Sequence, residues 1–273
     1  MMSAIHHRVY NRIGETRGDV GITRRTFIGA GTIAAAGSIV PFARTVRAFA
    51  RQDPLVLTPP DKPRHELVEG QNPLAINNDR DGVIYIPKGY KRDAPMPLVV
   101  ALHGAGSSGA NAGFAFRQAD EFGYIVLAPD SRDWTWDSIL GHGQDSEFLG
   151  AAFQSTVERC AVDRRRLALA GFSDGATHVL SFGIANGDVF GHLMAFSPGL
   201  MRPPDAKGKP RIFISHGTAD PTMPIDVTSR RFAPRLKALG YDVTYREFDG
   251  RHTLPPDIAH DAYDWFIKGS APA

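Results

Sequence analysis

Six apolar runs, separated by segments long enough for helices, constrain the fold of this 273-residue chain more than any other feature. Strands that are so uniformly apolar are buried on both faces, as in a parallel sheet covered by helices. The runs are 97–103, 124–129, 166–171, 192–197, 211–217 and 243–248. The amphipathic segments are 111–122, 146–160, 174–186, 226–239 and 257–268. This alternation predicts one doubly wound α/β domain.

The residues before these runs predict an antiparallel entry into the sheet. Residues 73–87 hold two short apolar runs around an Asn/Asp/Gly cluster, which is the pattern of a hairpin. The proline-rich segment 51–73 predicts an irregular lead-in with a short edge strand at 55–57, so the domain itself is expected over 74–270. In the segment 226–239, Pro234 is expected to kink the helix or to delay its start.

The first 50 residues are typical of an export signal rather than of a folded domain. Arg24 and Arg25 precede a glycine-rich apolar run that is too short for a good transmembrane helix, and small residues at 48–50 suit a peptidase. This leader resembles a twin-arginine signal peptide, which is recognised by the Tat export machinery. We therefore expect a mature protein in the periplasm or outside the cell, without a stable membrane anchor.

Composition narrows the classes of partner and cofactor. Residues 1–50 carry seven Lys/Arg and two acids, so the rest of the chain has a net charge of about −3, against +2 for the whole. A weakly acidic body gives no electrostatic reason to bind nucleic acid. The single cysteine, Cys160, excludes an intramolecular disulfide and is expected to be a buried structural thiol. No common metal-binding motif is present in the sequence, so no metal is expected.

Residues 171–175, Gly-Phe-Ser-Asp-Gly, lie between an apolar run and a helical segment. This is the G-x-S-x-G nucleophile elbow, in which glycines leave room for a sharp turn that holds the serine hydroxyl above the sheet. The pattern predicts Ser173 as a nucleophile. A similar stretch around Ser197 has Ala195 in place of the first glycine, so Ser197 is expected to lie at a strand end near the pocket instead.

A serine nucleophile needs a base that is oriented by a third group, and elbow enzymes supply them in the order Ser, acid, His. Asp220 follows the run 211–217 in a proline-fixed loop, and His252 follows the run 243–248. Because the carboxyl ends of parallel strands meet at one edge of a sheet, we expect Asp220 and His252 to complete a catalytic triad. The less favoured candidates are Asp226, Asp249, Asp257, His216 and His260, of which His216 is expected to be a packed structural residue.

Residues 103–109, His-Gly-Ala-Gly-Ser-Ser-Gly, allow two interpretations. Gly104, Gly106 and Gly109 have the G-x-G-x-x-G spacing of a dinucleotide phosphate loop, and Asp130 stands near the place of its ribose-binding acid. That interpretation predicts an exported nicotinamide-dinucleotide oxidoreductase. However, His-Gly after a strand also begins the oxyanion loop of ester hydrolases.

The oxyanion interpretation is favoured because it also accounts for the elbow and for the two later candidates of the triad. Acyl transfer needs two N–H donors directed at the developing oxyanion. The expected donors are the backbone N–H groups of Ala105 and of Asp174, the residue after the nucleophile. Asp130 is then a strand-end acid with a capping or pocket-edge role, and no cofactor is expected.

The substrate pocket is marked by three aromatic residues and by a short connection. Phe172, Trp134 and Trp136 are candidates for an aromatic wall, and ordinary core packing is the alternative. Only about a dozen residues separate the runs 192–197 and 211–217, where many lipases insert a lid. We therefore expect an open site without a large lid domain, and an aromatic or short-acyl ester as substrate.

Taken together, these motifs resemble the α/β-hydrolase superfamily. The resemblance is to its phospholipase/carboxylesterase branch and to exported bacterial esterases related to feruloyl esterases and polyhydroxybutyrate depolymerases. The matching stretches lie within residues 74–268. The resemblance implies the α/β-hydrolase fold, Ser173, Asp220 and His252 as triad, and cofactor-free hydrolysis of a small-molecule ester. Secreted depolymerases commonly carry disulfides, which one cysteine cannot form, so a polymer is not the expected substrate.

Overall fold

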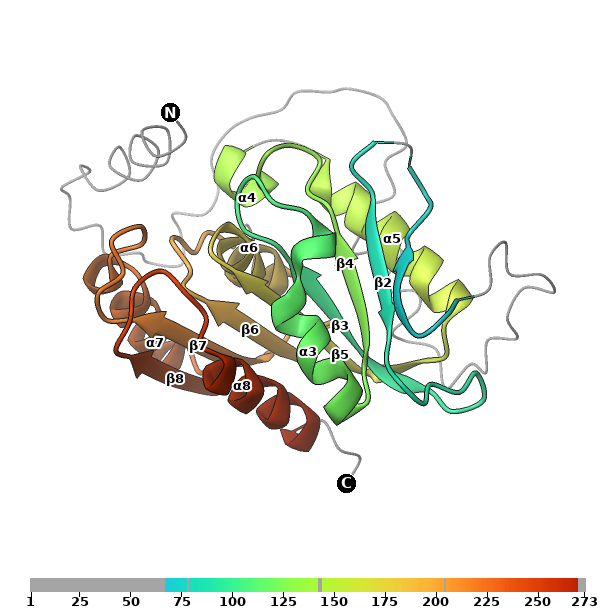
Figure 1. The fold of residues 1–273 in the computed structure, drawn as a ribbon. Coiled ribbons are helices and arrows are strands. Elements are labelled where there is room, and N and C mark those ends of the chain that lie inside the picture. Colours follow the sequence, from blue (N-terminus) through green and yellow to red (C-terminus); the bar gives the residue numbers. More distant parts are fainter. Residues whose placement is uncertain (1–66, 78, 142–143, 204, 270–273) are drawn as a thin grey trace. The chain divides into compact units, whose positions relative to one another are not determined.

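An eight-stranded sheet forms the centre of the part of the chain that the computed structural model describes, residues 67–77, 79–141, 144–203 and 205–269 (Figure 1). Its order is β1-β2-β4-β3-β5-β6-β7-β8. The strands are β1 (Gly70–Pro73), β2 (Gly82–Ile86), β3 (Met96–Leu102), β4 (Ile125–Pro129), β5 (Val162–Phe172), β6 (His192–Phe196), β7 (Arg211–Gly217) and β8 (Val243–Phe248). The predicted leader 1–50 and the expected strand at 55–57 lie outside the described residues.

The six predicted apolar runs are the parallel strands β3 to β8, which confirms the mostly parallel, doubly wound sheet. Successive side chains of a strand point to opposite faces. In β3, Leu98, Val100 and Leu102 accordingly join one buried cluster, and Val99 and Ala101 join the other. The edge strand β8 is only partly buried, because it has a neighbour on one side alone and carries Arg and Glu among its apolar residues.

The antiparallel entry is confirmed, but its first strand lies earlier than expected. β2 pairs antiparallel with both β1 and β4. β1 occupies Gly70–Pro73, inside the segment that was expected to be irregular, because its backbone pairs with β2 and the Asn72 side chain is buried there. The Asn72 amide donates to the carbonyls of Val68 and Gly70, which satisfies this buried polar group locally.

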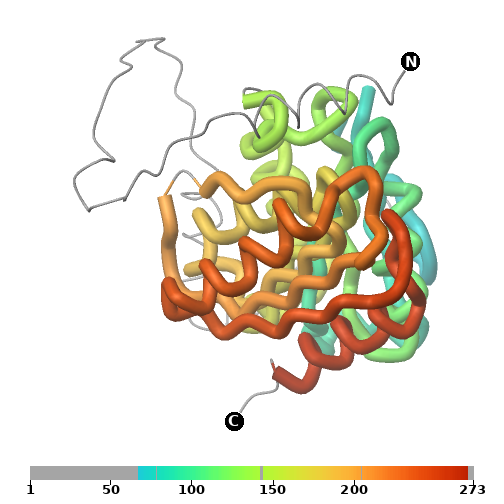
Figure 2. The backbone as a smooth tube through the Cα atoms, turned by 90° about the vertical axis from the view of Figure 1, so that its left-hand side faces the viewer, coloured from blue at the N-terminus to red at the C-terminus, as the bar shows by residue number. Residues whose placement is uncertain are grey.

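Helices cover both faces of the sheet (Figure 1). α3 (Gly113–Phe122) and α8 (Pro256–Gly269) bury one face, where Tyr124, the residue before β4, and Tyr263 of α8 stack at 5.2 Å. α5 (Asp145–Arg159), α6 (Asp174–His178) and α7 (Ser229–Ala238) cover the other face. Figure 2 views the same arrangement from the side of β8, with the C-terminal helices nearest the reader.

Local chemistry explains where several helices differ from their predicted bounds. Pro234 lies inside α7, whose start is delayed to Ser229 behind a 3₁₀ turn, η3 (Ile225–Val227). The predicted helix 174–186 begins as α6 and continues as a π-helical turn, η2 (Val179–Gly183). Two short elements were not predicted: α4 (Asp137–Leu140) and the 3₁₀ turn η1 (Gly109–Asn111). Within the described residues, no helix is both long and apolar enough to cross a membrane.

The connection between β6 and β7, at the carboxyl edge of the sheet, is short. Residues 197–210, between β6 and β7, contain no helix in their described part. This agrees with the expectation of a domain without a large lid at that position. The turns after β3, β5, β7 and β8 therefore form the surroundings of the candidate site.

Candidate active site

The turn between β5 and α6 holds Ser173 in a conformation that few non-glycine residues adopt. Its φ is 58° and its ψ is −120°, as the residue that precedes the first turn of α6. A Cβ on Gly171 would lie 2.5 Å from the carbonyl carbon of Gly175, and a Cβ on Gly175 would lie 2.1 Å from the carbonyl oxygen of Leu102. A side chain at either glycine would therefore collide with backbone atoms. The positive φ of Ser173 is a strained conformation, and backbone strain of this kind is concentrated at functional sites.

The structure brings the three predicted triad residues into hydrogen-bond contact. His252 Nε2 lies 2.8 Å from Ser173 Oγ, and His252 Nδ1 lies 2.6 Å from Asp220 Oδ2. Ser173 and Asp220 are buried, whereas His252 is partly exposed. These distances are those of a nucleophile, a base and an orienting acid.

The Asp220 carboxylate has four polar contacts. The backbone N–H groups of Thr222 and Met223 donate to Oδ1 at 2.8 and 2.9 Å. His252 and His216 both contact Oδ2, His216 Nε2 at 3.2 Å. Burial by itself raises the pKa of Asp220, but hydrogen bonds from His216, His252 and the Met223 N–H outweigh it and hold the pKa well below its ordinary value. The carboxylate is therefore ionised throughout the neutral range.

The less favoured acids and histidines lie elsewhere. Asp226 is exposed and forms an ion pair with Arg230 at 2.7 Å, and Asp249 and Asp257 are also exposed. His260 is on the surface of α8, 3.1 Å from Glu121. Among the described residues, none of these side chains forms a hydrogen bond or an ion pair with Ser173 or His252.

The loop after β3 lies against the elbow. A Cβ on Gly104 would lie 3.4 Å from the Cβ of Ser173. The Gly104 carbonyl accepts a hydrogen bond from His103 Nδ1 at 2.7 Å and from the Ser107 N–H at 3.3 Å. The N–H of Ala105 belongs to the same trans peptide and points the opposite way. It has no acceptor among the described residues, which leaves it available to a ligand.

His103 holds this peptide as a neutral imidazole. Its Nδ1 donates to the Gly104 carbonyl, and its Nε2 accepts the N–H of Ser131 at 3.0 Å. Burial lowers the pKa of His103 and favours this uncharged form. Arg80 joins the same two loops by donating to the carbonyls of Ser131 and Ser107 at 2.5 and 2.9 Å.

The other two glycines of the loop are already engaged. The N–H of Gly106 donates to the Trp134 carbonyl at 2.6 Å, and the N–H of Gly109 donates to Asp130 Oδ1 at 2.6 Å. A Cβ on Gly109 would lie 1.8 Å from the Ala128 carbonyl oxygen, so this glycine is needed for close contact with β4. A pyrophosphate cradle requires free N–H groups at these positions, which makes the dinucleotide interpretation unsupported. Asp130 caps the loop instead.

The three predicted pocket aromatics have different surroundings. The Phe172 ring lies 4.9 Å from the His252 ring, so it borders the candidate site, whereas Trp134 is 37% exposed and contacts the loop after β3 through its backbone carbonyl. Trp136 is fully buried, and its Nε1 donates to the His103 carbonyl at 2.8 Å. The expectation that Trp136 forms a pocket wall is therefore wrong for this conformation, because the ring supports the loop from within the core.

Two residues at the site were not identified from the sequence. Thr135 Oγ1 donates to Asp174 Oδ2 at 2.6 Å, and both side chains are fully buried, so the loop after β4 is joined to the elbow. His216 was expected to be structural, and its contact with Asp220 was not predicted. The spacing of four residues between His216 and Asp220 indicates nothing alone, because the contact depends on the turn that follows β7.

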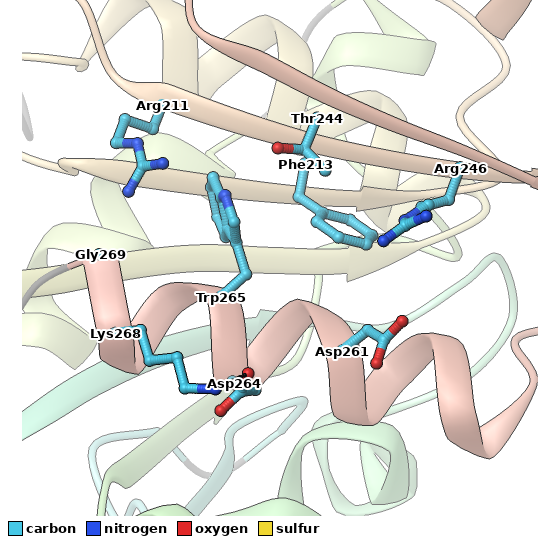
Figure 3. A pocket seen from close by; sticks show the side chains of 9 residues that line it. All are labelled: Arg211, Phe213, Thr244, Arg246, Asp261, Asp264, Trp265, Lys268 and Gly269. Atoms are coloured by element: carbon cyan, nitrogen blue, oxygen red, sulfur yellow. Dashed lines mark hydrogen bonds and ion pairs between the residues drawn. The ribbon is translucent and has the colours of Figure 1, made fainter.

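A groove of about 460 Å³ between α8 and the β8 edge is separate from this site (Figure 3). Its lining consists of Arg211, Phe213, Thr244, Arg246, Asp261, Asp264, Trp265, Lys268 and Gly269. Arg211 is the first residue of β7, whereas the elbow contacts the other end of the neighbouring strand β6, where the Ser173 N–H donates to the Phe196 carbonyl. The groove contains none of the candidate catalytic residues.

The described residues contain no cluster of three or more His, Cys, Asp or Glu side chains placed to hold a metal ion. Cys160 is buried, and burial raises the pKa of its thiol to about 12, as expected for an unreactive structural cysteine. The reactive side chains that the structure brings together at this site are Ser173, His252 and Asp220.

A mostly parallel sheet with a serine on the β5–α6 turn and a histidine and an acid on later loops defines the α/β-hydrolase fold. Solved structures agree. Esterase PE8 superposes with a TM-score of 0.58 at 24% identity, covering 70% of this chain and 99% of that protein. A phospholipase/carboxylesterase from Dyadobacter fermentans has a TM-score of 0.53 at 22% identity, covering 68% and 96%.

The comparison with curated sequences finds esterases. Feruloyl esterase C from Emericella nidulans is 25% identical over 171 residues, which cover 58% of this chain and 63% of that enzyme. The chain thus spans less than two thirds of the length of the first curated relatives that it matches. No protein-family model matches the sequence.

Proposed function

We propose that this protein is a serine hydrolase that cleaves carboxylic esters through Ser173, His252 and Asp220. The observation that carries the proposal is the continuous chain of hydrogen bonds from Ser173 Oγ through His252 to Asp220, at 2.8 and 2.6 Å. The similarity to feruloyl esterase C and to solved esterases supports the same reaction class. The oxidoreductase alternative has no support from the comparisons or from the loop hydrogen bonds.

In this mechanism, His252 Nε2 removes the hydroxyl proton of Ser173 as the oxygen attacks the ester carbonyl carbon. Asp220 stabilises the imidazolium that forms, and His252 then gives the proton to the leaving alcohol. The N–H groups of Ala105 and Asp174 are the proposed donors to the oxyanion of the tetrahedral intermediate. Water, activated by His252, hydrolyses the resulting acyl-enzyme and restores Ser173.

The proposed substrate is a small-molecule ester with an aromatic or short acyl group. The Phe172 ring beside His252 supports this preference with apolar surface at the site, and the partly exposed Trp134 is the proposed second aromatic residue of the pocket. A panel of nitrophenyl, feruloyl and thioester substrates tests this preference. Comparable turnover of long-chain acyl esters would contradict it.

A fluorophosphonate probe tests the nucleophile without knowledge of the natural ester. Peptide mass spectrometry of the labelled protein should find the adduct on Ser173 alone. The acid is tested with Asp220→Asn, which should lower kcat by up to about 10⁴. Asp249→Asn is the matched control, since this exposed carboxylate precedes His252 by three residues. If Asp249→Asn were the more damaging change, the acid assignment would be wrong.

We also propose that residues 1–50 are a twin-arginine signal, followed by a lead-in and by the hydrolase domain, whose first described strand is β1 (Gly70–Pro73). This assignment depends on the sequence of the leader, and the predicted site of action is the periplasm or the medium. The double substitution Arg24→Lys with Arg25→Lys should retain the precursor in the cytoplasm, in an active form because it needs no disulfide. Normal export of that variant would refute the twin-arginine proposal.

A further inference from the structure

His216 is a second imidazole on the acid of the proposed triad. It is the penultimate residue of β7 and is completely buried. Its Nε2 lies 3.2 Å from Asp220 Oδ2 and 2.7 Å from the Met223 carbonyl oxygen. Its Nδ1 lies 2.7 Å from Ser229 Oγ, in the first turn of α7. The ring therefore connects α7 with the carboxylate.

The contacts determine which nitrogen carries a hydrogen toward Asp220. A carbonyl oxygen only accepts hydrogen bonds, so the 2.7 Å contact with Met223 requires a hydrogen on His216 Nε2. Asp220 Oδ2 lies 3.2 Å from the same Nε2, so the hydrogen that is donated to the Met223 carbonyl also lies close to the carboxylate. His216 Nε2 and His252 Nδ1 thus both contact the same carboxylate oxygen, at 3.2 and 2.6 Å.

We propose that His216 is a positioning residue that fixes the Asp220 carboxylate and, by sharing Oδ2, moderates the basicity of His252. A carboxylate oxygen with two N–H donors gives less stabilisation to each than an oxygen with one. The His252 imidazolium is consequently held less tightly than in a site where Asp220 Oδ2 has a single partner. This inference rests on the proposed function, because it assigns a role within the same triad.

The charged groups around His216 support an effect directed at Asp220. Besides Asp220, Glu247 is a titratable neighbour, which is opposite His216 in the β7–β8 register. Glu247 is already paired with Arg230, at 2.6 and 2.9 Å. The partners of His252 itself are Ser173, Asp220 and the Phe172 ring.

The pH dependence of inactivation by a fluorophosphonate tests this role on the full chain. The rate constant should fall at low pH as His252 gains a proton. His216→Phe removes the donor but keeps a buried ring, so the midpoint of this acid limb should move to higher pH by about half to one unit. The rate at the plateau should fall roughly five- to tenfold, because the carboxylate is less well fixed.

Two further variants separate positioning from packing. His216→Gln places an amide donor near the position of Nε2 and should return the midpoint toward that of the wild type. Ser229→Ala removes the group at Nδ1 and should shift the midpoint in the same direction as His216→Phe, but less. His192→Phe is the matched control, because His192 is also a buried strand histidine but begins β6 and contacts Trp265 and Phe266. It should leave the midpoint unchanged.

The outcomes distinguish this role from the proposed function. An unchanged or lowered midpoint in folded His216→Phe and Ser229→Ala, with normal labelling of Ser173, would overturn the role of His216 alone. A wild-type protein that is not labelled at Ser173 would overturn the triad and the role of His216 together. Circular dichroism and melting curves establish that each variant is folded, and His216→Gln and Ser229→Ala test the proposal if His216→Phe does not fold.

Discussion

Two glycine-containing turns meet at the carboxyl edge of the sheet, the elbow (residues 171–175) and the loop after β3 (residues 103–109), and they are held by different forces. The elbow is constrained by backbone contacts, because a Cβ on Gly171 would strike Gly175 and a Cβ on Gly175 would strike Leu102 of β3. The loop is held by hydrogen bonds with side chains, those of His103 within it and of Arg80 and Asp130 outside it. Gly104 even has room for a side chain, since its nearest neighbour would be 3.4 Å away.

This difference shows why glycine spacing is a weak guide to function. The G-x-G-x-x-G pattern of the loop matches a phosphate cradle, yet two of its three glycine N–H groups donate to Trp134 and Asp130. In the G-x-S-x-G pattern of the elbow, close backbone contacts leave no room for a side chain at either glycine. Few other residues could therefore occupy these two positions. A pattern is specific when every position in it is required by a contact.

The largest effect is expected at the elbow. Ser173→Ala should lower kcat by about 10⁶, because it removes the nucleophile that His252 activates. Ser197→Ala is the control, since Ser197 also has a positive φ, 55°, at the end of β6 but lacks the flanking glycine of the elbow. Steady-state kinetics should find Ser197→Ala close to the wild type, and the reverse order of activities would contradict the elbow assignment.

The loop should contribute through its backbone. Ala105→Pro removes one proposed oxyanion donor and should lower kcat by about 10²–10³, with a smaller change in KM. Ala105→Ser keeps the N–H and should have a mild effect. Both variants must first show the circular dichroism and melting curve of the wild type. Unimpaired hydrolysis by a folded Ala105→Pro variant would exclude this N–H as a donor.

Alanine substitutions at Gly175 and at Gly104 should differ in their effect on the free energy of unfolding. Gly175→Ala places a Cβ 2.1 Å from the Leu102 carbonyl oxygen, so the free energy of unfolding should fall by about 1–3 kcal/mol or more. Gly104→Ala meets only ordinary contacts and should change it by less than about 0.5 kcal/mol. Denaturant unfolding measures both. Equal losses would show that the loop is as tightly constrained at Gly104 as the elbow is at Gly175.

The smallest expected effect is that of a dinucleotide on the melting temperature, which tests the phosphate-cradle interpretation. Saturating NAD or NADP should not raise the melting temperature, because the N–H groups of Gly106 and Gly109 are already bonded. Asp130→Ala should lower the free energy of unfolding by about 1–2 kcal/mol by leaving the Gly109 N–H without its acceptor. Thermal scans check both statements. A clear shift with dinucleotide, lost in Asp130→Ala, would restore the rejected interpretation.

The alternation of apolar runs and helical segments was sufficient to predict the doubly wound sheet, because burial on both faces leaves a pattern in each strand separately. The candidates Ser173, Asp220 and His252 could be selected because each follows a predicted strand end. The start of β1 could not be found, since Gly70–Pro73 becomes a strand only by pairing with β2. The burial of Trp136 could not be predicted either, because its indole N–H donates to the carbonyl of His103, which is 33 residues away in the sequence.

The sequence by itself therefore determined the order of elements and the loops that carry reactive side chains, since these follow from local hydrophobic period and turn chemistry. Only the tertiary structure decided which N–H groups are free and which acid oxygen is shared. Ala105 and Gly106 are adjacent in the sequence, but the Gly106 N–H is bonded to Trp134 and the Ala105 N–H has no acceptor among the described residues. His216 likewise gains its place at Asp220 from the turn after β7 and from α7. Hydrogen bonds between distant segments depend on how strands and loops assemble, and a short stretch of sequence does not contain that information.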